Sequence, residues 1–176
     1  MKKVTLLTIF AALMMISSAA VAQTASGALT VTANVTGSIN LVFNSDASGL
    51  ALSSGAGTNA ATLAFGNVSA FGAISAGIVR STTATNFTVS SAVDVLVTKT
   101  NSASANYSLT AQLGSADAVN TWTVGGVGVT NAAAAPITAT GTYGSNSNFP
   151  VAITVPFTTA SGPLISNTIN YVATAN

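Results

Sequence analysis

The sequence predicts an all-β protein made of many short antiparallel strands, and three observations support this prediction. Thr, Ser, Ala, Val, Asn and Gly dominate, and the β-branched residues stand in short runs bounded by Gly, Pro, Asn or Ser. The best helical candidate, residues 68–80, is interrupted by Gly72 and Gly77 and lacks a 3.6-residue period. Two stretches, 27–43 and 167–176, alternate between apolar and polar residues as half-buried strands do.

The first 22 residues have the features of a signal peptide. Lys2 and Lys3 precede the apolar run VTLLTIFAALMMI, which is too short to span a bilayer. Residues 20–22 form an A-x-A cleavage site. We therefore expect a mature chain that begins at Gln23 and is exported, rather than one held by an uncleaved membrane anchor.

The mature chain carries very few charges. Its two positive side chains, Arg80 and Lys99, stand against Asp46, Asp94 and Asp117, so its formal net charge is −1. Nucleic-acid binding needs clustered Lys and Arg, and this composition excludes it. A surface so close to neutral also lacks the charge repulsion that keeps small domains apart, which favours self-association.

The chain contains no Cys, His or Glu, which removes most catalytic chemistry. A Ser–His or Cys–His pair is excluded, and a carboxylate pair would need two of the three aspartates to meet across a cleft. Zinc has no His or Cys ligand, and residues 44–49 (NSDASG) resemble an Asx-rich turn more than a calcium loop. We expect no enzyme, no metal site, no cofactor and no disulfide.

Residues of the mature chain are expected to form strands wherever β-branched runs alternate between turn signals. Boundaries of this kind are uncertain by two to four residues. The expected strands lie near residues 28–35, 38–43, 61–65, 86–90, 92–99, 106–113, 120–124, 127–130, 137–143, 150–157 and 165–175.

Two connections and one strand have sequences with a specific interpretation. Gly125 and Gly126 in NTWTVGGVGVT supply the positive φ angles of a two-residue hairpin turn. Pro150 and Pro156 bracket VAITV and predict a strand at a sheet edge or beside a bulge, because each proline removes a ladder donor. Residues 44–61, rich in Gly, Ser, Ala and Asn, read as a long flexible loop.

The alternation over residues 27–43 is longer than one strand of a small sandwich. Its odd positions are apolar or Gly and its even positions from Thr30 to Asn40 are polar, over a length of roughly 50 Å at about 3.3 Å per residue. Either the chain bends at Gly37 and Ser38 and crosses between sheets of its own domain, or residues 23–36 form an extension. Such an extension would complete the sheet of a neighbouring subunit by strand addition. The donor side chains would be Leu29, Val31, Ala33 and Val35.

The last residues, NTINYVATAN, also alternate, which predicts a final strand docked in a sheet. Together with the alternating N-terminal segment and LAFGNVSAFG (63–72), this strand resembles the pilin-like subunits of chaperone-usher fibres, including the spore-coat-protein-U type. The resemblance implies an immunoglobulin-like β-sandwich over residues 37–176 that lacks one strand and receives the extension of the next subunit. The disulfide that many such subunits carry is missing here. An ordinary last strand in a self-complete sandwich is the alternative.

The function expected from these features is that of an exported structural subunit of a surface fibre or coat in a bacterium, located in the periplasm and then at the cell surface. Its partners would be further copies or a related subunit, with a periplasmic chaperone and usher implied by the resemblance. The alternative is a monomeric secreted binding module that holds a glycan on an aromatic platform. Trp122, Tyr107 and Tyr143 are the candidate residues, although a lone Trp in a strand is typically a core anchor.

Overall fold

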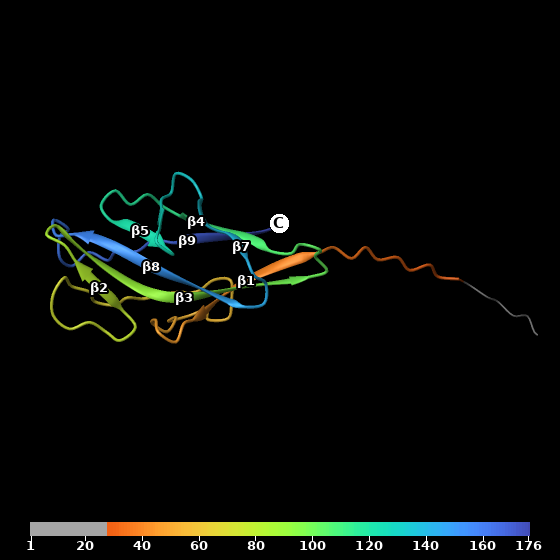
Figure 1. Ribbon diagram of the computed structural model, residues 1–176, viewed down its shortest axis with the longest axis horizontal. Helices are drawn as coiled ribbons and strands as arrows, with labels where there is room; N and C mark the ends of the chain where they lie inside the picture. The colour runs from red at the N-terminus through yellow and green to blue at the C-terminus, as the bar shows by residue number, and fades with distance from the viewer. Residues whose placement is uncertain (1–27) are drawn as a thin grey trace, which may run out of the picture. The chain divides into compact units, whose positions relative to one another are not determined.

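The computed structural model describes residues 28–176, so the expected signal peptide and residues 23–27 lie outside the described part. From residue 28 onward the chain contains strands and loops without a helix, and the strands form two antiparallel sheets of a β-sandwich (Figure 1). The predicted all-β fold class is therefore confirmed. No helix able to cross a membrane occurs within this part of the chain.

The first sheet contains six strands, of which the two longest, β3 and β8, are central. Its order is β1-β3-β8-β5-β6, and β2 pairs with the first residues of β3 on the same side as β1. All pairings are antiparallel. The strands are β1 (Ser38–Ser45), β2 (Val79–Thr82), β3 (Asn86–Thr100), β5 (Thr121–Val124), β6 (Val127–Val129) and β8 (Asn146–Pro156).

The second sheet has only three strands, in the order β7-β4-β9. They are β4 (Tyr107–Leu113), β7 (Ala135–Gly141) and β9 (Ile169–Ala175). The β4–β9 ladder is continuous over seven residues of each strand, whereas the β4–β7 ladder contains register shifts near Leu109. On one side of the sandwich, the amide of Leu113 donates to the Thr130 carbonyl and links β4 to the end of β6.

The core lies between the sheets because β3, β4 and β8 alternate strictly. In β3 the odd positions from Phe87 to Val97 are buried, and the even positions are half-buried on the opposite face. The buried residues form two clusters. The larger contains Ile78, Phe87, Val89, Val93, Ala111, Leu113, Trp122, Val124, Val129, Val151, Ile153 and Val155. The smaller contains Val95, Val97, Tyr107 and Leu109, and the half-buried Phe43, Ile137, Phe149 and Tyr171 pack against both.

Two predicted strands at 86–90 and 92–99 are one continuous strand, β3. The residue between them, Ser91, is buried, and its hydroxyl accepts a hydrogen bond of 2.7 Å from the Leu50 amide. A polar residue at an inward position therefore does not interrupt the strand, because the loop after β1 supplies its partner.

The expectation that the VAITV strand lies at an edge was wrong, because β8 is central between β3 and β5. The ladder with β5 covers only residues 151–154, so both prolines lie beyond its ends. The Pro150 carbonyl accepts from the Gly125 amide. Since N and C=O of a strand residue face the same flank, the missing donor of Pro150 faces the β5–β6 turn, and the β3 ladder keeps its bonds.

Two glycine positions follow directly from local geometry. Gly125 and Gly126 both have positive φ, 57° and 81°, which confirms the predicted two-residue turn between β5 and β6. Gly141 closes β7 against the ring of Tyr107, and a Cβ placed there would lie 2.2 Å from the ring carbon Cζ. The fully buried tyrosine therefore requires glycine at position 141.

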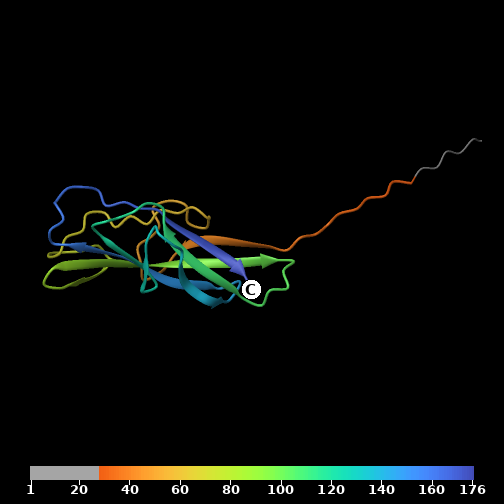
Figure 2. The ribbon, with the colours of Figure 1, turned by 90° about the horizontal axis from the view of Figure 1, so that it is seen from above.

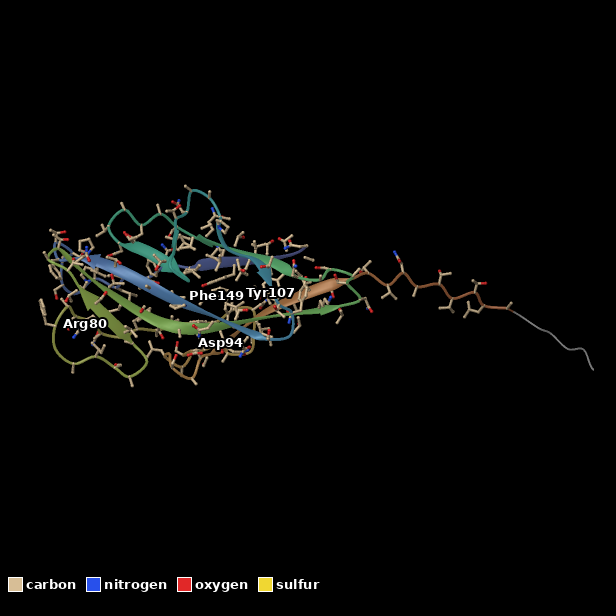
Figure 3. The ribbon with its side chains drawn as sticks, in the orientation of Figure 1. Arg80, Asp94, Tyr107 and Phe149 are labelled. Carbon is tan, nitrogen blue, oxygen red and sulfur yellow. The ribbon has the colours of Figure 1, made fainter. Side chains whose placement is uncertain are left out.

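A long loop, residues 46–78, connects β1 to β2 and is anchored rather than free. The Phe43 amide donates to the Thr58 carbonyl, and Arg80 donates to the carbonyls of Ser69 and Gly72 at 2.8 and 2.7 Å. Figure 3 shows Arg80 on β2, next to this loop. The strand expected at 61–65 is absent except for an isolated bridge at Thr62. Most of the helical candidate at 68–80 belongs to this loop, and its last two residues begin β2.

Candidate functional site

The first candidate is the segment 28–37, in which no strand forms. The strand expected at 28–35 is therefore absent from the described chain. Every side chain in the segment is exposed, and Leu29, Val31 and Val35 are exposed by 88, 80 and 71%. Ala33, the fourth predicted donor residue, is exposed as well. The segment thus keeps an alternating apolar face that its own chain leaves in solvent.

The second candidate is the outer edge of β9. Among the described residues β9 has one ladder partner, β4, so the backbone groups on its other side have no strand to bind. Ile169, Tyr171 and Ala173 are half-buried and Val172 is 56% exposed. The predicted terminal strand therefore forms, four residues shorter at its start than expected, and it lies at the edge of the three-stranded sheet.

β1 lies opposite β9 on this side of the sandwich. The rings of Phe43 and Tyr171 meet edge to face with centroids 5.1 Å apart. Leu41 on β1 and Ala173 on β9 are half-buried against the smaller core cluster. Burial raises the pKa of Tyr171 above its ordinary value, so the phenol stays neutral at physiological pH. The two strands therefore border an incompletely covered part of the core.

The chain end is fixed beside this edge. The Asn176 amide donates to the Asn106 carbonyl at 3.0 Å, and its side-chain Nδ2 donates to Asn106 Oδ1 and to the Ala139 carbonyl. One residue thus joins the strand β9 to the start of β4 and to β7. These bonds hold the last strand in register up to its final residue.

The three aromatic residues proposed for a glycan platform do not form a common exposed surface. Tyr107 is fully buried and Trp122 is 5% exposed, so neither presents a ring face to solvent. Tyr143 packs on Tyr107 with ring centroids 5.3 Å apart, and Lys99 Nζ lies 5.0 Å from its ring centroid. Figure 3 shows Tyr107 between the sheets beside Phe149. Burial of two of the three residues argues against the platform and identifies them as core anchors.

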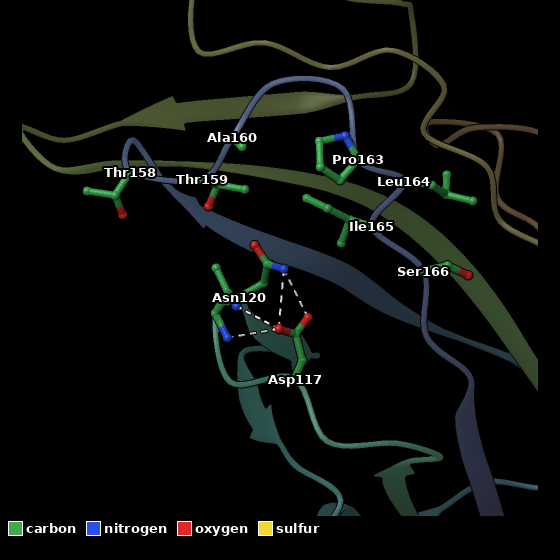
Figure 4. A pocket seen from close by; sticks show the side chains of 10 residues that line it. Asp117, Asn120, Thr158, Thr159, Ala160, Pro163, Leu164, Ile165 and Ser166 are labelled. Carbon is green, nitrogen blue, oxygen red and sulfur yellow. Dashed lines mark hydrogen bonds between the residues drawn. The ribbon is translucent and has the colours of Figure 1, made fainter.

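Asp117 organises the turn before β5. Its Oδ1 accepts from the amides of Val119 and Asn120 at 3.0 and 2.8 Å (Figure 4). Its Oδ2 accepts from Trp122 Nε1 at 2.8 Å. Desolvation raises the pKa of this carboxyl, but the bonds from Asn120, Trp122 and Val119 outweigh it and lower the pKa to about 2. The bond to Trp122 depends on the fold, because it joins the turn to the strand that follows it.

A surface hollow of about 450 Å³ lies between this turn and residues 158–166 (Figure 4). Both oxygens of Asp117 are occupied by the chain's own donors, so the carboxylate is not free to bind a ligand. Buried oxygens of Asn120 and Thr159 have no hydrogen-bond partner within the described part of the chain. The hollow therefore presents no free charge, and these two unpaired oxygens are buried rather than exposed to a ligand.

The other two aspartates lie near each other on the outer face of the first sheet. Asp94 accepts from the side-chain amides of Asn146 and Asn148 at 3.0 and 3.2 Å. Asp46 accepts from the Ser48 amide and hydroxyl, which lower its pKa. Across residues 28–176, no group of three or more His, Cys, Asp or Glu side chains could hold a metal ion. Asp94 thus links β3 to β8 through two amide–carboxylate bonds, whereas Asp46 closes a turn within the loop after β1.

Comparison of the chain with family models, with characterised proteins and with solved structures finds no match. The site is therefore defined by geometry alone: an exposed alternating segment before β1, and an open strand edge at β9.

Proposed function

We propose that this protein is a structural subunit that assembles by β-strand addition, in which residues 23–36 of one copy pair with the outer edge of β9 in another. The observation that carries the proposal is that the described chain contains both an unpaired alternating segment and a strand, β9, whose outer edge has no partner. Strand addition would supply backbone hydrogen bonds to both the segment and the β9 edge, and it would bury the apolar face of the segment.

The lengths of the two elements agree. The donor face runs from Leu29 to Val35, which is seven residues, and β9 also contains seven residues, Ile169–Ala175. At about 3.3 Å per residue the two strands would lie side by side over roughly 23 Å. Four apolar side chains at alternate positions would then face the core between β1 and β9.

Burial of the donor face would supply the energy of association. Leu29 and Val31, now almost fully exposed, would each contribute about 1.5–3 kcal/mol if they became fully buried. The receiving sheet would grow from three strands to four. A sandwich that lacks one strand is the immunoglobulin-like, pilin-like arrangement that the sequence resemblance implies, and export to the cell surface belongs to the same proposal.

The test compares the chain from Gln23 with a truncated chain from Gly37, by light scattering and negative-stain microscopy. We expect the longer chain to form fibres or oligomers, and the truncated chain to stay monomeric and to bind a peptide of residues 23–36. A peptide with Leu29→Ser and Val31→Ser should not bind. A matched peptide with Thr30→Ala and Thr32→Ala, which keeps the apolar face, should bind. If both chains are stable monomers, or if the truncated chain assembles equally well, strand addition is excluded.

A further inference from the structure

The segment 61–70, ATLAFGNVSA, shows the burial pattern of a strand without belonging to a sheet. Residues 61–66 alternate between half-buried and exposed, and the half-buried positions include Leu63 and Phe65. Farther along, Val68 and Ala70 are half-buried too. All four of these apolar side chains pack against the larger core cluster. The segment therefore covers core residues that a sandwich normally covers with a strand.

Its backbone is held only near its two ends. At the start, the Ser53 amide donates to the Thr62 carbonyl and the Thr62 amide donates to Ser54, which fixes a small hairpin. At the other end, Arg80 binds the carbonyl of Ser69. Among the described residues, no backbone hydrogen bond joins residues 63–68 to any other segment. Side-chain packing alone therefore holds the middle of the segment in place.

The segment packs against the larger core cluster and not against the smaller one. Leu63 and Phe65 pack against the same cluster as Ile169, at the start of β9. The smaller cluster, which Leu41 and Ala173 flank, receives no side chain from residues 46–78. In Figure 2 the loop between β1 and β2 lies on the same side of the sandwich as the β8–β9 connection. A strand added along all seven residues of β9 would thus meet open core at the Ala173 end and this segment at the Ile169 end.

We infer that residues 61–70 are an internal occupant of the Ile169 end of the β9 edge, which an added strand must displace. This inference rests on the strand-addition function proposed above. The occupant covers part of the core in the free subunit, and its loosely bonded backbone lets it leave without breaking a ladder. Because an added strand binds only the form in which the occupant has moved, the occupant lowers the affinity for that strand.

The test measures the affinity of a fluorescent peptide of residues 28–36 by anisotropy. The receiving chain begins at Gln23 and carries Leu29→Ser and Val31→Ser, so that its own donor face is polar. Phe65→Ser is added to loosen the occupant, and Ala64→Ser, at the exposed neighbouring position, is the matched control. We expect Phe65→Ser to tighten peptide binding by about threefold or more, and Ala64→Ser to leave it unchanged.

A second measurement uses the absence of Cys in the chain. Leu63→Cys should react with a maleimide slowly in the free chain and faster once the peptide is bound, whereas Ala64→Cys should react quickly in both states. Equal or weaker binding by folded Phe65→Ser, with unchanged reactivity of Leu63→Cys, would overturn the inference and leave strand addition standing. Failure of every version to bind the peptide would overturn both proposals.

Discussion

Two segments of this chain alternate in the same way and have different structures. Residues 169–175 form β9, and residues 28–37 form no strand. Both alternate apolar with polar residues, apart from Ala28 and Val172, and both contain Val, Thr and Asn, so local propensity does not separate them. The difference is the partner: β9 pairs with β4 over seven residues, and no strand in the described chain pairs with the earlier segment. An alternating sequence is therefore compatible with a half-buried strand, but the strand forms only where a neighbouring strand is available to pair with it.

β9 itself is only half-satisfied, because it has one neighbour. Three parts of the described chain thus differ in their number of paired sides. Residues 28–37 are paired on neither side, β9 is paired on one, and β3 is paired on both. The destabilisation caused by a substitution should therefore be largest in strands with two partner strands and smallest in the segment with none.

The largest effect is expected for Leu109→Ala in β4, the strand that holds β9. Leu109 is fully buried, so the substitution removes packing from the smaller cluster and leaves a cavity between the sheets. We expect the free energy of unfolding to fall by about 2–5 kcal/mol in chemical denaturation. Val172→Ala, on the exposed face of β9, should cost less than about 1 kcal/mol. Equal losses for the two variants would contradict the assignment of β4 as the anchor of the edge.

An intermediate effect is expected for Asp117→Asn, measured by thermal unfolding between pH 7 and pH 2. The folded pKa of Asp117, about 2, is below its ordinary value of 3.8. The contribution of the carboxylate is thus fully present above about pH 4 and is lost as the pH falls toward 2. Since this group is largely solvated, the substitution should cost less than about 1 kcal/mol at pH 7. The gap between wild type and variant should close near pH 2.

The same pH scan tests whether the segment before β1 contributes to the pH dependence of stability. Residues 28–36 contain no ionisable side chain, so a chain that begins at Gly37 should keep the pH profile of the longer chain. A profile that changes on truncation would mean that the segment contacts the titrating groups of the domain.

The smallest effect is expected for Leu29→Ser with Val31→Ser in the unassembled chain. Both side chains are exposed, so replacement should change the free energy of unfolding by less than about 0.5 kcal/mol at protein concentrations where light scattering shows monomers. Assembly should be lost in the same variant. A destabilised monomer would show that the segment packs on its own domain, and the comparison with β9 would then fail.

Much of the fold could be predicted because the period-two pattern is local. The antiparallel strands, the Gly125-Gly126 turn and the terminal strand were all visible in the sequence. The position of β8 was not, because a proline excludes a donor on one flank only and the sequence does not say which flank is occupied. The absence of strands at 28–35 and 61–65 was not predictable either, since both alternate well and lack a ladder partner.

One part of the candidate site could be predicted from the sequence and the other could not. The donor face could be read from residues 29–35 because it is a pattern of neighbouring side chains. The edge that would receive it depends on which strands of the second sheet pair, so only the order β7-β4-β9 reveals it. Trp122 and Tyr107 show the limit of composition: aromatic type indicates either a core anchor or a ligand surface, and only their burial decides.

The ladder between β1 and β3 determines how the domain would resist a pulling force applied to the chain before β1. The two strands pair over eight consecutive residues, from Ser38 opposite Thr100 to Ser45 opposite Val93. Tension applied to the chain before Ser38, along the strand, would load these hydrogen bonds in shear, so that they resist together instead of opening one at a time. The Phe43 amide bond to the loop and the packing of Leu41 and Phe43 on the core add to that resistance. A subunit linked through this end would stretch little before it ruptured.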